Sequence, residues 1–425
     1  MSATLQRTRT TSAIFAAWGL FSALGLIMLG NGLLGTLLGI RAESEGFATA
    51  STGVIMASYF AGFLFGSQLA PRILERVGHV RVFAALASLA SAAPLVHSVF
   101  VSPAVWSLMR LVFGFAMAGL YVVAESWLNQ AADNTTRGRL LSVYMLVMMG
   151  GYAASQGFIG LADPSGFRLF VLASLFVSLA VVPISLSQGN APSFNAPETL
   201  KLATAWRVAP LGIIGGIGSG LASGALVGLG PVYASRIGFS TTQIAALMAA
   251  ALIGSVLLQW PIGHMSDRIP RRRALLIINT IAAAVAVGGA QTNSPSFMSL
   301  VVVMLLFGSF SYPLYSVALS HINDVVSSNQ AVAASSLFVF VTGIGAIAGP
   351  LLAAFAIDAI GPRGFFFVLA IIHAGVAAFA LLRISTRVAL VSTEEQRPWR
   401  PFPARASAVI ARLGKARKNG SRIIG

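Results

Sequence analysis

Cysteine is absent from this chain of 425 residues, and charged side chains are scarce. The first absence excludes disulfides, cysteine nucleophiles and thiolate metal sites. Charged residues make up 9% of the chain, whereas a soluble globular domain carries about 25%, so a soluble domain is excluded as well. The sequence also shows no nucleotide-binding loop, no metal-ligand cluster and no nucleophile–base arrangement. We therefore predict that the protein is not an enzyme and needs no cofactor.

Long apolar stretches fill most of the chain, which is 56% hydrophobic with a mean hydropathy of +0.82. Twelve stretches of roughly 17 to 28 residues can be marked, each long enough as a helix to cross a hydrocarbon core of about 30 Å. They lie at 12–40, 48–70, 82–100, 103–124, 140–162, 167–187, 208–233, 241–262, 274–291, 297–319, 331–357 and 364–382. Runs of this length are helices and not barrel strands. The expected fold class is therefore an all-α membrane protein with twelve transmembrane helices.

An internal repeat divides these segments into two sets of six. Residues in the first part recur in the same order between 192 and 195 positions later. The repeated elements are Gly46-Phe47, Met56 and Gly62 (Gly238-Phe239, Met248 and Gly254), Gly114 with Leu120-Tyr121 (Gly308 with Leu314-Tyr315), and Asp163 with Arg168 (Asp358 with Arg363). A duplicated apolar chain of this length is typical of a carrier built from two pseudo-symmetric six-helix bundles.

The repeat and the composition predict four regions. Residues 1–187 form the N-terminal bundle, 188–206 a polar cytoplasmic linker, 207–383 the C-terminal bundle, and 384–425 a basic cytoplasmic tail. Two alternatives are open for the tail. Val409, Ile410 and Leu413 could share one face of a short helix on anionic lipid, or the tail could be an unstructured basic segment.

The net charge of +16 sets the topology and does not indicate nucleic-acid binding. Of the 28 Lys and Arg residues, 23 fall in the N-terminus, the loops on one face and the tail. An excess of Lys and Arg marks the cytoplasmic face of a membrane protein. We therefore expect a multi-pass protein of the bacterial cytoplasmic (inner) membrane, with both termini inside and the first helix retained.

The loop after the eighth segment carries a recognisable pattern, Gly263-x3-Asp267-Arg268-x2-Arg271-Arg272-Arg273. This stretch, residues 263–273, resembles the signature loop of the major facilitator superfamily, with Pro270 where a Gly is usual. In the first half we expect Gly66 and Ala70 at the positions of Gly263 and Asp267, so that this copy lacks the Asp. The resemblance implies the superfamily's two-bundle fold and alternating-access transport.

Further motifs are similar to one branch of that superfamily, the YcaD-like bacterial carriers. They are Arg110-x3-Gly114, Glu125-Ser-Trp-Leu-Asn129, Arg137-Gly-Arg139, Tyr312-Pro-Leu-Tyr315, His321-Ile-Asn-Asp324 and Gly343-x-Gly345-x3-Gly349-Pro350. The similarity covers roughly residues 12 to 385. The branch implies no particular substrate.

Helices 1, 4, 7 and 10 line the cavity in that family, which gives a set of candidate substrate-binding residues. The polar ones on these helices are Asn31, Arg110, Tyr121, Ser219, Ser223, Tyr312 and Tyr315. Arg110 lies about 10 Å deep if its helix begins at Pro103, where a charged side chain costs at least about 2.5 kcal/mol. It should therefore contact substrate or a gating partner, or else stiffen the bundle by pairing. For the repeated tyrosines Tyr121 and Tyr315, aromatic packing is the simpler interpretation.

A second set is expected to act in gating: Glu125, Arg137, Arg139, Gly263, Asp267, Arg268 and Arg272. We expect Glu125 to pair with an arginine of its own half, the candidates being Arg72, Arg76 and Arg81. Asp267 is expected to pair with Arg137 or Arg139 when the cytoplasmic side closes. The repeated Asp–Arg pairs, Asp163/Arg168 and Asp358/Arg363, are expected to be local, and His373 to be a packing residue with satisfied hydrogen bonds.

These observations predict a monomeric secondary transporter that moves a small organic solute across the membrane by alternating access. Proton-coupled efflux is a family-level expectation, although no acidic residue lies in the middle of a predicted span, which favours a uniporter or an indirect role for Arg110 or His373. The expected partners are the solute, the lipid bilayer, and anionic lipids at the basic tail, with no nucleic acid. The alternative is a receptor or scaffold that keeps the fold without transporting.

Overall fold

The computed structural model describes residues 17–131, 136–186, 202–291, 295–327, 330–388 and 391–399. The predicted tail helix and nearly all of the predicted linker lie outside the described residues. The helices of the first half are α2 (Trp18–Ser44), α3 (Thr49–Val77), α4 (His79–Val99), α5 (Pro103–Ala131), α6 (Arg137–Ser155) with the 3-10 turn η1 (Gln156–Leu161), α7 (Arg168–Leu179) and α8 (Val181–Leu186). Those of the second half are α9 (Leu202–Val208), α10 (Pro210–Arg236), α11 (Thr241–Arg268), α12 (Arg271–Ala290), α13 (Phe297–Ser311), α14 (Pro313–Val325), α15 (Ala331–Ile360) and α16 (Gly364–Thr386).

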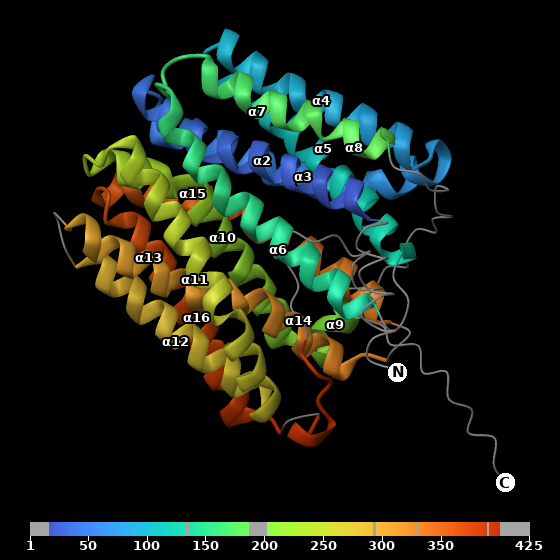
Figure 1. Cartoon of the computed structure of the whole chain (residues 1–425). Coiled ribbons are helices and arrows are strands. Elements are labelled where there is room, and N and C mark those ends of the chain that lie inside the picture. The colour runs from blue at the N-terminus through green and yellow to red at the C-terminus, as the bar shows by residue number, and fades with distance from the viewer. Residues whose placement is uncertain are drawn as a thin grey trace, which may run out of the picture.

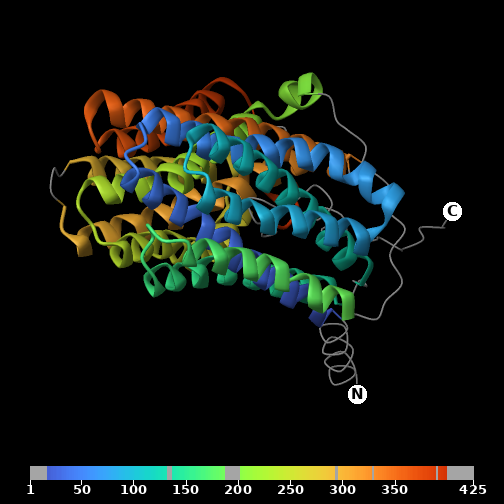
Figure 2. The same cartoon turned by 90° about the horizontal axis from the view of Figure 1, so that it is seen from above.

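The two halves form separate bundles that lie side by side (Figures 1 and 2). Trp18 and Pro210 begin α2 and α10, and His79 and Arg271 begin α4 and α12, 192 residues apart in both cases. Within the described ranges, eleven segments are long and apolar enough to cross a membrane. The remaining predicted span is α6 with η1, which starts at Arg137 and packs against α2. The all-helical two-bundle fold is confirmed.

The repeated Gly-Phe pair ends the first helix of each half. Gly46 has φ +69° and Gly238 has φ +86°, a left-handed conformation that glycine adopts without a steric penalty. The Phe47 amide donates to the carbonyl of Ala42, five residues back, and the Phe239 amide makes the same bond in α10. This is a Schellman-type helix end, so the repeat marks the stop signal of α2 and of α10.

The other repeated glycines mark the closest helix crossing in each half. A Cβ placed on Gly62 of α3 would lie 1.9 Å from the carbonyl oxygen of Leu111, and one on Gly254 of α11 would lie 1.9 Å from that of Leu305. Gly114 and Gly308 meet the partner backbones from the opposite side at 2.0 and 1.9 Å. In lipid, helices associate by close packing of small residues. The glycine pairs therefore fix α3 against α5, and α11 against α13, with no room for any side chain.

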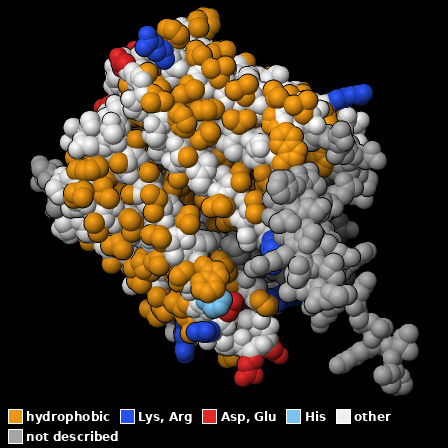
Figure 3. Space-filling view, viewed as in Figure 1, with side chains coloured by type: hydrophobic (Ala, Val, Ile, Leu, Met, Phe, Trp, Pro, Cys, Tyr) orange, Lys and Arg blue, Asp and Glu red, His pale blue; other side chains and the backbone are white. Residues whose placement is uncertain are grey.

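The outer surface of the bundles is apolar. In the face shown in Figure 3, hydrophobic side chains cover the middle, and the charged side chains gather towards two opposite ends. Large apolar residues such as Phe355, Ile371 and Leu146 are about 70% exposed (74%, 70% and 69%). A soluble monomer rarely exposes so much apolar surface, whereas lipid covers it in a membrane protein.

Candidate functional site

The two halves are bonded to each other at one end, which we call the latch end. Arg236, the last residue of α10, donates through Nε to both carboxylate oxygens of Glu43 of the first half, at 3.1 and 3.2 Å. Its Nη1 lies 3.8 Å from Asp358 of α15, and Asp358 in turn accepts a hydrogen bond from Thr49, the first residue of α3. The four side chains form a chain of contacts that crosses the boundary between the halves twice.

This network corrects the expected local pairing of Asp358 with Arg363. Asp358 turns to Arg236 and Thr49, because the end of α15 lies against the start of α3 and the end of α10. Its first-half counterpart Asp163 is bonded instead to the amide and hydroxyl of Ser165, at 2.9 and 2.6 Å. Those two hydrogen bonds lower the pKa of Asp163 below its usual value. Neither carboxylate makes the predicted pair.

Tight apolar packing accompanies the charges at the latch end. Met56 of α3, 1% exposed, lies against Gly228 of α10, and Gly53 of α3 lies against Ala354 of α15. Gly39 of α2 leaves room for Pro231 of α10. Because all of these contacts join residues of different halves, the latch end is closed in this structure.

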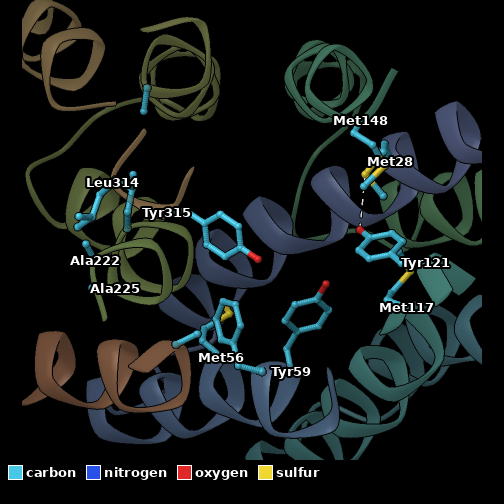
Figure 4. Packing of buried hydrophobic residues seen from close by; sticks show 14 of the residues in the cluster. Met28, Met56, Tyr59, Met117, Tyr121, Met148, Ala222, Ala225, Leu314 and Tyr315 are labelled. Carbon is cyan, nitrogen blue, oxygen red and sulfur yellow. Dashed lines mark hydrogen bonds between the residues drawn. The ribbon is translucent and has the colours of Figure 1, made fainter. Parts of the chain in front are cut away.

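Buried polar residues from both halves meet in the middle of the molecule. The Asn31 side-chain amide donates to the Tyr121 hydroxyl at 3.3 Å, and that hydroxyl points at the Met28 sulfur, 3.6 Å away (Figure 4). The hydroxyl groups of Tyr59 and of Tyr315, the latter from the second half, point into the same region (Figure 4). Three of the predicted cavity residues, Asn31, Tyr121 and Tyr315, are thus near one another, and each is at most 3% exposed.

Arg110 lies inside the first half, between α3 and α5. It is 3% exposed, and its guanidinium carbon lies 4.4 Å from the ring centre of Tyr59 and 6.0 Å from that of Phe113. An aromatic face attracts a cation, by about 2 kcal/mol when the pair is desolvated. One partner of Arg110 is therefore the ring of Tyr59, whose hydroxyl points to the middle of the molecule. A contact with substrate stays a prediction.

The other candidates of the cavity set are distributed along the second half. Ser219 is buried on α10, and the Ser223 hydroxyl donates to the carbonyl of Gly220 one turn earlier. Tyr312 is half-buried at the break between α13 and α14, where Pro313 begins the new helix. The Tyr315 ring packs edge-on against Phe338, with ring centres 4.9 Å apart.

Glu125 is fully buried, and the predicted pairing with Arg72, Arg76 or Arg81 is wrong. Those three arginines are exposed at the surface, whereas Glu125 lies on the face of α5 that is turned towards α6. There the Tyr144 hydroxyl donates to its Oε1 at 2.5 Å. The positions 194 residues later are Leu319 and Phe338, so this polar pair has an apolar counterpart.

The signature loop lies at the opposite end of the molecule, which we call the tail end. Asp267 accepts from Arg271 Nη2 at 2.8 Å and from the Trp399 amide at 2.8 Å. Arg271 also pairs with Asp324 at 3.2 Å, and both members of that pair are at most 2% exposed. These contacts all lie within the second half. Pairing of Asp267 with Arg137 or Arg139 stays a prediction, and the Arg137 side chain lies outside the described residues.

The remaining gating candidates also belong to the tail end. Arg272 donates to the carbonyl oxygens of Arg383, Arg387 and Val388, at 2.8 to 3.3 Å, and so caps the end of α16 in its own half. Arg139 and Arg268 are exposed. Gly263 lies under the Trp399 ring.

The helix ends change the expected alignment of the two loops. Since α4 begins at His79 and α12 at Arg271, Glu75 takes the place of Asp267, four residues before each helix. Ala70 is therefore not the counterpart, and the first half does carry an acid, although an exposed one. His79 takes the place of Arg271 and bonds through Nε2 to Ser126 at 2.9 Å.

His373 is a packing residue, as predicted. Its Nδ1 is bonded to Asn279 at 2.8 Å and its Nε2 to Ser311 at 3.0 Å. The ring thereby joins α16, α12 and α13 in the interior of the second half.

The sequence reasoning missed Glu43, Thr49, Tyr59, Tyr144 and Trp399. One signal was available for Glu43, since it lies in the last turn of α2 and Arg236 lies in the last turn of α10. Tyr59 and Tyr144 lie on α3 and α6, outside the set of helices that the resemblance placed at the cavity.

Comparisons with known proteins agree with this architecture. The family model described as Major Facilitator Superfamily matches residues 212–421, and the one described as Sugar (and other) transporter matches residues 13–194. The uncharacterized MFS-type transporter YE1530 of Yersinia enterocolitica is 29% identical, over 78% of this chain and 86% of that protein. The uncharacterized MFS-type transporter YcaD of Escherichia coli is 28% identical over the same shares.

Solved structures share the fold. The nucleoside transporter NupG aligns with a TM-score of 0.68 at 16% identity, over 87% of this chain and 98% of NupG. A bacterial homologue of the human lysosomal transporter Spinster aligns with a TM-score of 0.70 at 15% identity, over 91% and 98%.

Two helical bundles with related segments, joined by charges at one end and sharing buried polar residues in the middle, define a two-repeat membrane carrier. The chain belongs to the major facilitator superfamily, with YcaD-type transporters among its relatives.

Proposed function

We propose that the protein is a secondary transporter that carries a small organic solute between its halves by alternating access. The observation that carries the proposal is the closure of the latch end. The halves are bonded there across the boundary, Arg236 to Glu43 and Asp358 to Thr49, whereas the ion pairs described for the signature loop at the tail end lie within the second half. Opening the latch end and closing the tail end would move a solute bound near Asn31, Tyr121 and Tyr315 across the membrane.

The tail end is proposed to face the cytoplasm of a bacterial cell, because the basic residues are concentrated there. Two exposed residues of this cysteine-free chain can test the orientation, Ser385 at the tail end and Ser165 at the latch end. In intact cells an impermeant thiol reagent should label Ser165→Cys and leave Ser385→Cys unlabelled. The reverse result would invert the proposed orientation.

The transport proposal is tested by the movement of a solute. Thermal-shift measurements of the purified protein against metabolites and drugs should identify a stabilising solute, whose uptake into proteoliposomes is then followed. Arg110→Lys keeps the charge but loses the planar guanidinium that stacks on Tyr59, so uptake should fall at least about tenfold while the protein still folds. A stabilising solute that is not moved by the wild-type protein would favour the receptor alternative.

A proton-coupled form of this transport is proposed to use Glu125. Its carboxylate is fully buried in α5 and is bonded to the Tyr144 hydroxyl of α6. A buried acidic residue in a membrane helix is costly, and such residues often serve ion pathways. Glu125→Gln should make uptake independent of pH, whereas Glu75→Gln, which changes an exposed carboxylate, should leave the pH profile unchanged. An unaltered profile in Glu125→Gln would remove Glu125 from the coupling mechanism.

A further inference from the structure

The segment 396–399, beyond α16, lies on the signature loop of the second half. In Figure 1 it belongs to the red stretch at the lower end of the molecule. The Trp399 side chain is only 8% exposed. A Cβ built on Gly263 would lie 2.3 Å from the Trp399 ring, so this glycine leaves the space that the indole fills.

The main chain of the same segment is bound by charged side chains. The Trp399 amide donates to Asp267 at 2.8 Å, and the Arg397 amide donates to Asp324 at 3.0 Å. The Arg397 carbonyl accepts from Arg271 Nη2 at 2.6 Å. Hydrogen bonds in which one partner is charged are stronger than those between neutral groups. Because the contacts fall on alternate residues, 397 and 399, the loop binds this segment as it would bind an extended peptide.

The binding groups are held ready by their own contacts. Arg271 is 1% exposed and is fixed by Asp267, by Asp324 and by the Ser266 hydroxyl, 2.5 Å from its Nη1. The corresponding positions of the first half cannot repeat this arrangement. Pro71 stands where Gly263 leaves room for an indole, and His79 stands in place of Arg271.

We propose that Gly263, Asp267, Arg271 and Asp324 form a binding site for the chain's own segment 396–399, the tail site, and that the bound segment acts as a brake on closure of the tail end. While Trp399 and Arg271 occupy the Asp267 carboxylate, Asp267 is held within its own half. Closure of the tail end would require it to turn to the first half, where Arg137 and Arg139 begin α6. This second step rests on the proposed alternating access.

Binding of the segment is tested by electron paramagnetic resonance on the full chain in nanodiscs. Spin labels on Pro398→Cys and Arg268→Cys, both at exposed positions, report the distance between the tail and the loop. A single narrow distance distribution is expected, which should broaden in Trp399→Ala. The matched control is Trp260→Ala, which removes an exposed indole from α11, the helix that carries the label at Arg268, and should leave the distribution narrow. A broad distribution in the otherwise unaltered chain would overturn the tail site.

The brake is tested by two truncations that differ by four residues. One chain ends after Trp399 and keeps the segment, and the other ends after Glu395 and lacks it. Ala354→Cys, buried between α15 and α3 at the latch end, reports opening there by its rate of thiol labelling. Loss of the segment should raise labelling about fivefold, as expected when one state loses a stabilising contact.

The chain that ends after Trp399 should label like the full chain. Equal labelling of the two truncated chains would overturn the brake even if the segment binds. Arg236→Ala, introduced with the same reporter, tests alternation without touching the tail. If Arg236→Ala raises the labelling of Ala354→Cys but truncation does not, the brake is wrong and the transport proposal stands.

Discussion

The latch end and the tail end both carry charge pairs, but the pairs differ in burial and in what they join. At the latch end Arg236 and Glu43 are 26% and 27% exposed and belong to different halves. At the tail end Arg271 and Asp324 are 1% and 2% exposed and belong to the same half. An exposed pair contributes about 0–1 kcal/mol, whereas breaking a buried pair costs about 3–5 kcal/mol.

The two kinds of ion pair suit different roles. An ion pair between halves that move relative to each other has to be weak enough for solute binding or thermal motion to break it. An ion pair within one half does not have to break during transport. The exposed pair of Arg236 and Glu43 therefore suits a gate, and the buried pair of Arg271 and Asp324 suits a fixed support for the signature loop.

The largest effect is expected from breaking the buried pair. Arg271→Ala leaves the Asp324 carboxylate buried without its cation, which should lower the free energy of unfolding by about 3–5 kcal/mol. Thermal unfolding in detergent and the amount of protein in the membrane measure it. Arg273→Ala, an exposed neighbour in the same helix, should change little. Equal stabilities for the two variants would contradict the contrast between the ends.

A smaller effect, on population and not on folding, is expected at the latch end. Arg236→Ala removes the ion pair with Glu43 across the boundary and should favour opening by on the order of 1 kcal/mol, about fivefold in the labelling of Ala354→Cys. The control is Arg41→Ala, which removes an arginine from the last turn of α2 in the first half. Arg41 pairs with Glu45 in its own half at 2.6 Å. If both variants label alike, the latch is not formed by charge.

The smallest effect is expected from salt. Raising the ionic strength from about 0.1 M to 1 M shortens the screening length from about 10 Å to 3 Å, which weakens exposed pairs far more than buried ones. Labelling of Ala354→Cys should rise about twofold or less with salt, and the unfolding temperature should not fall. If salt lowers the unfolding temperature, the exposed ion pairs contribute more to stability than the buried pair, against this prediction.

Much of the fold could be predicted, because its signals are local in sequence. Span length and the signature loop each depend on residues close together, and the repeat is recognised by comparing short segments of the two halves. Each repeated glycine has one of two structural roles. It ends a helix, as Gly46 does, or it allows two helices to cross closely, as Gly62 does. The predicted alignment of the two loops was wrong at Ala70, because it placed Gly66 opposite Gly263. The helix starts at His79 and Arg271 instead align Asp267 with Glu75.

The candidate site was harder to predict, because its contacts join distant residues. Glu125 was assigned to the surface arginines by its depth along α5, but depth does not determine which face of the helix a side chain occupies. Asp358 was given its nearest sequence partner, although α15 ends beside the other half. The tail contact of Trp399 could not be inferred at all, since nothing in residues 396–399 alone indicates what they touch.

The glycine crossings have a mechanical consequence. Where Gly62 and Gly114 bring α3 and α5 into backbone contact, there is no side chain that could change rotamer and absorb a displacement. The same holds for Gly254 and Gly308. We therefore expect α3 and α5, each about 40 Å long, to move together as one rigid unit. A displacement of a few ångströms at Thr49, where α3 meets Asp358, would then be transmitted to the other end of these two helices.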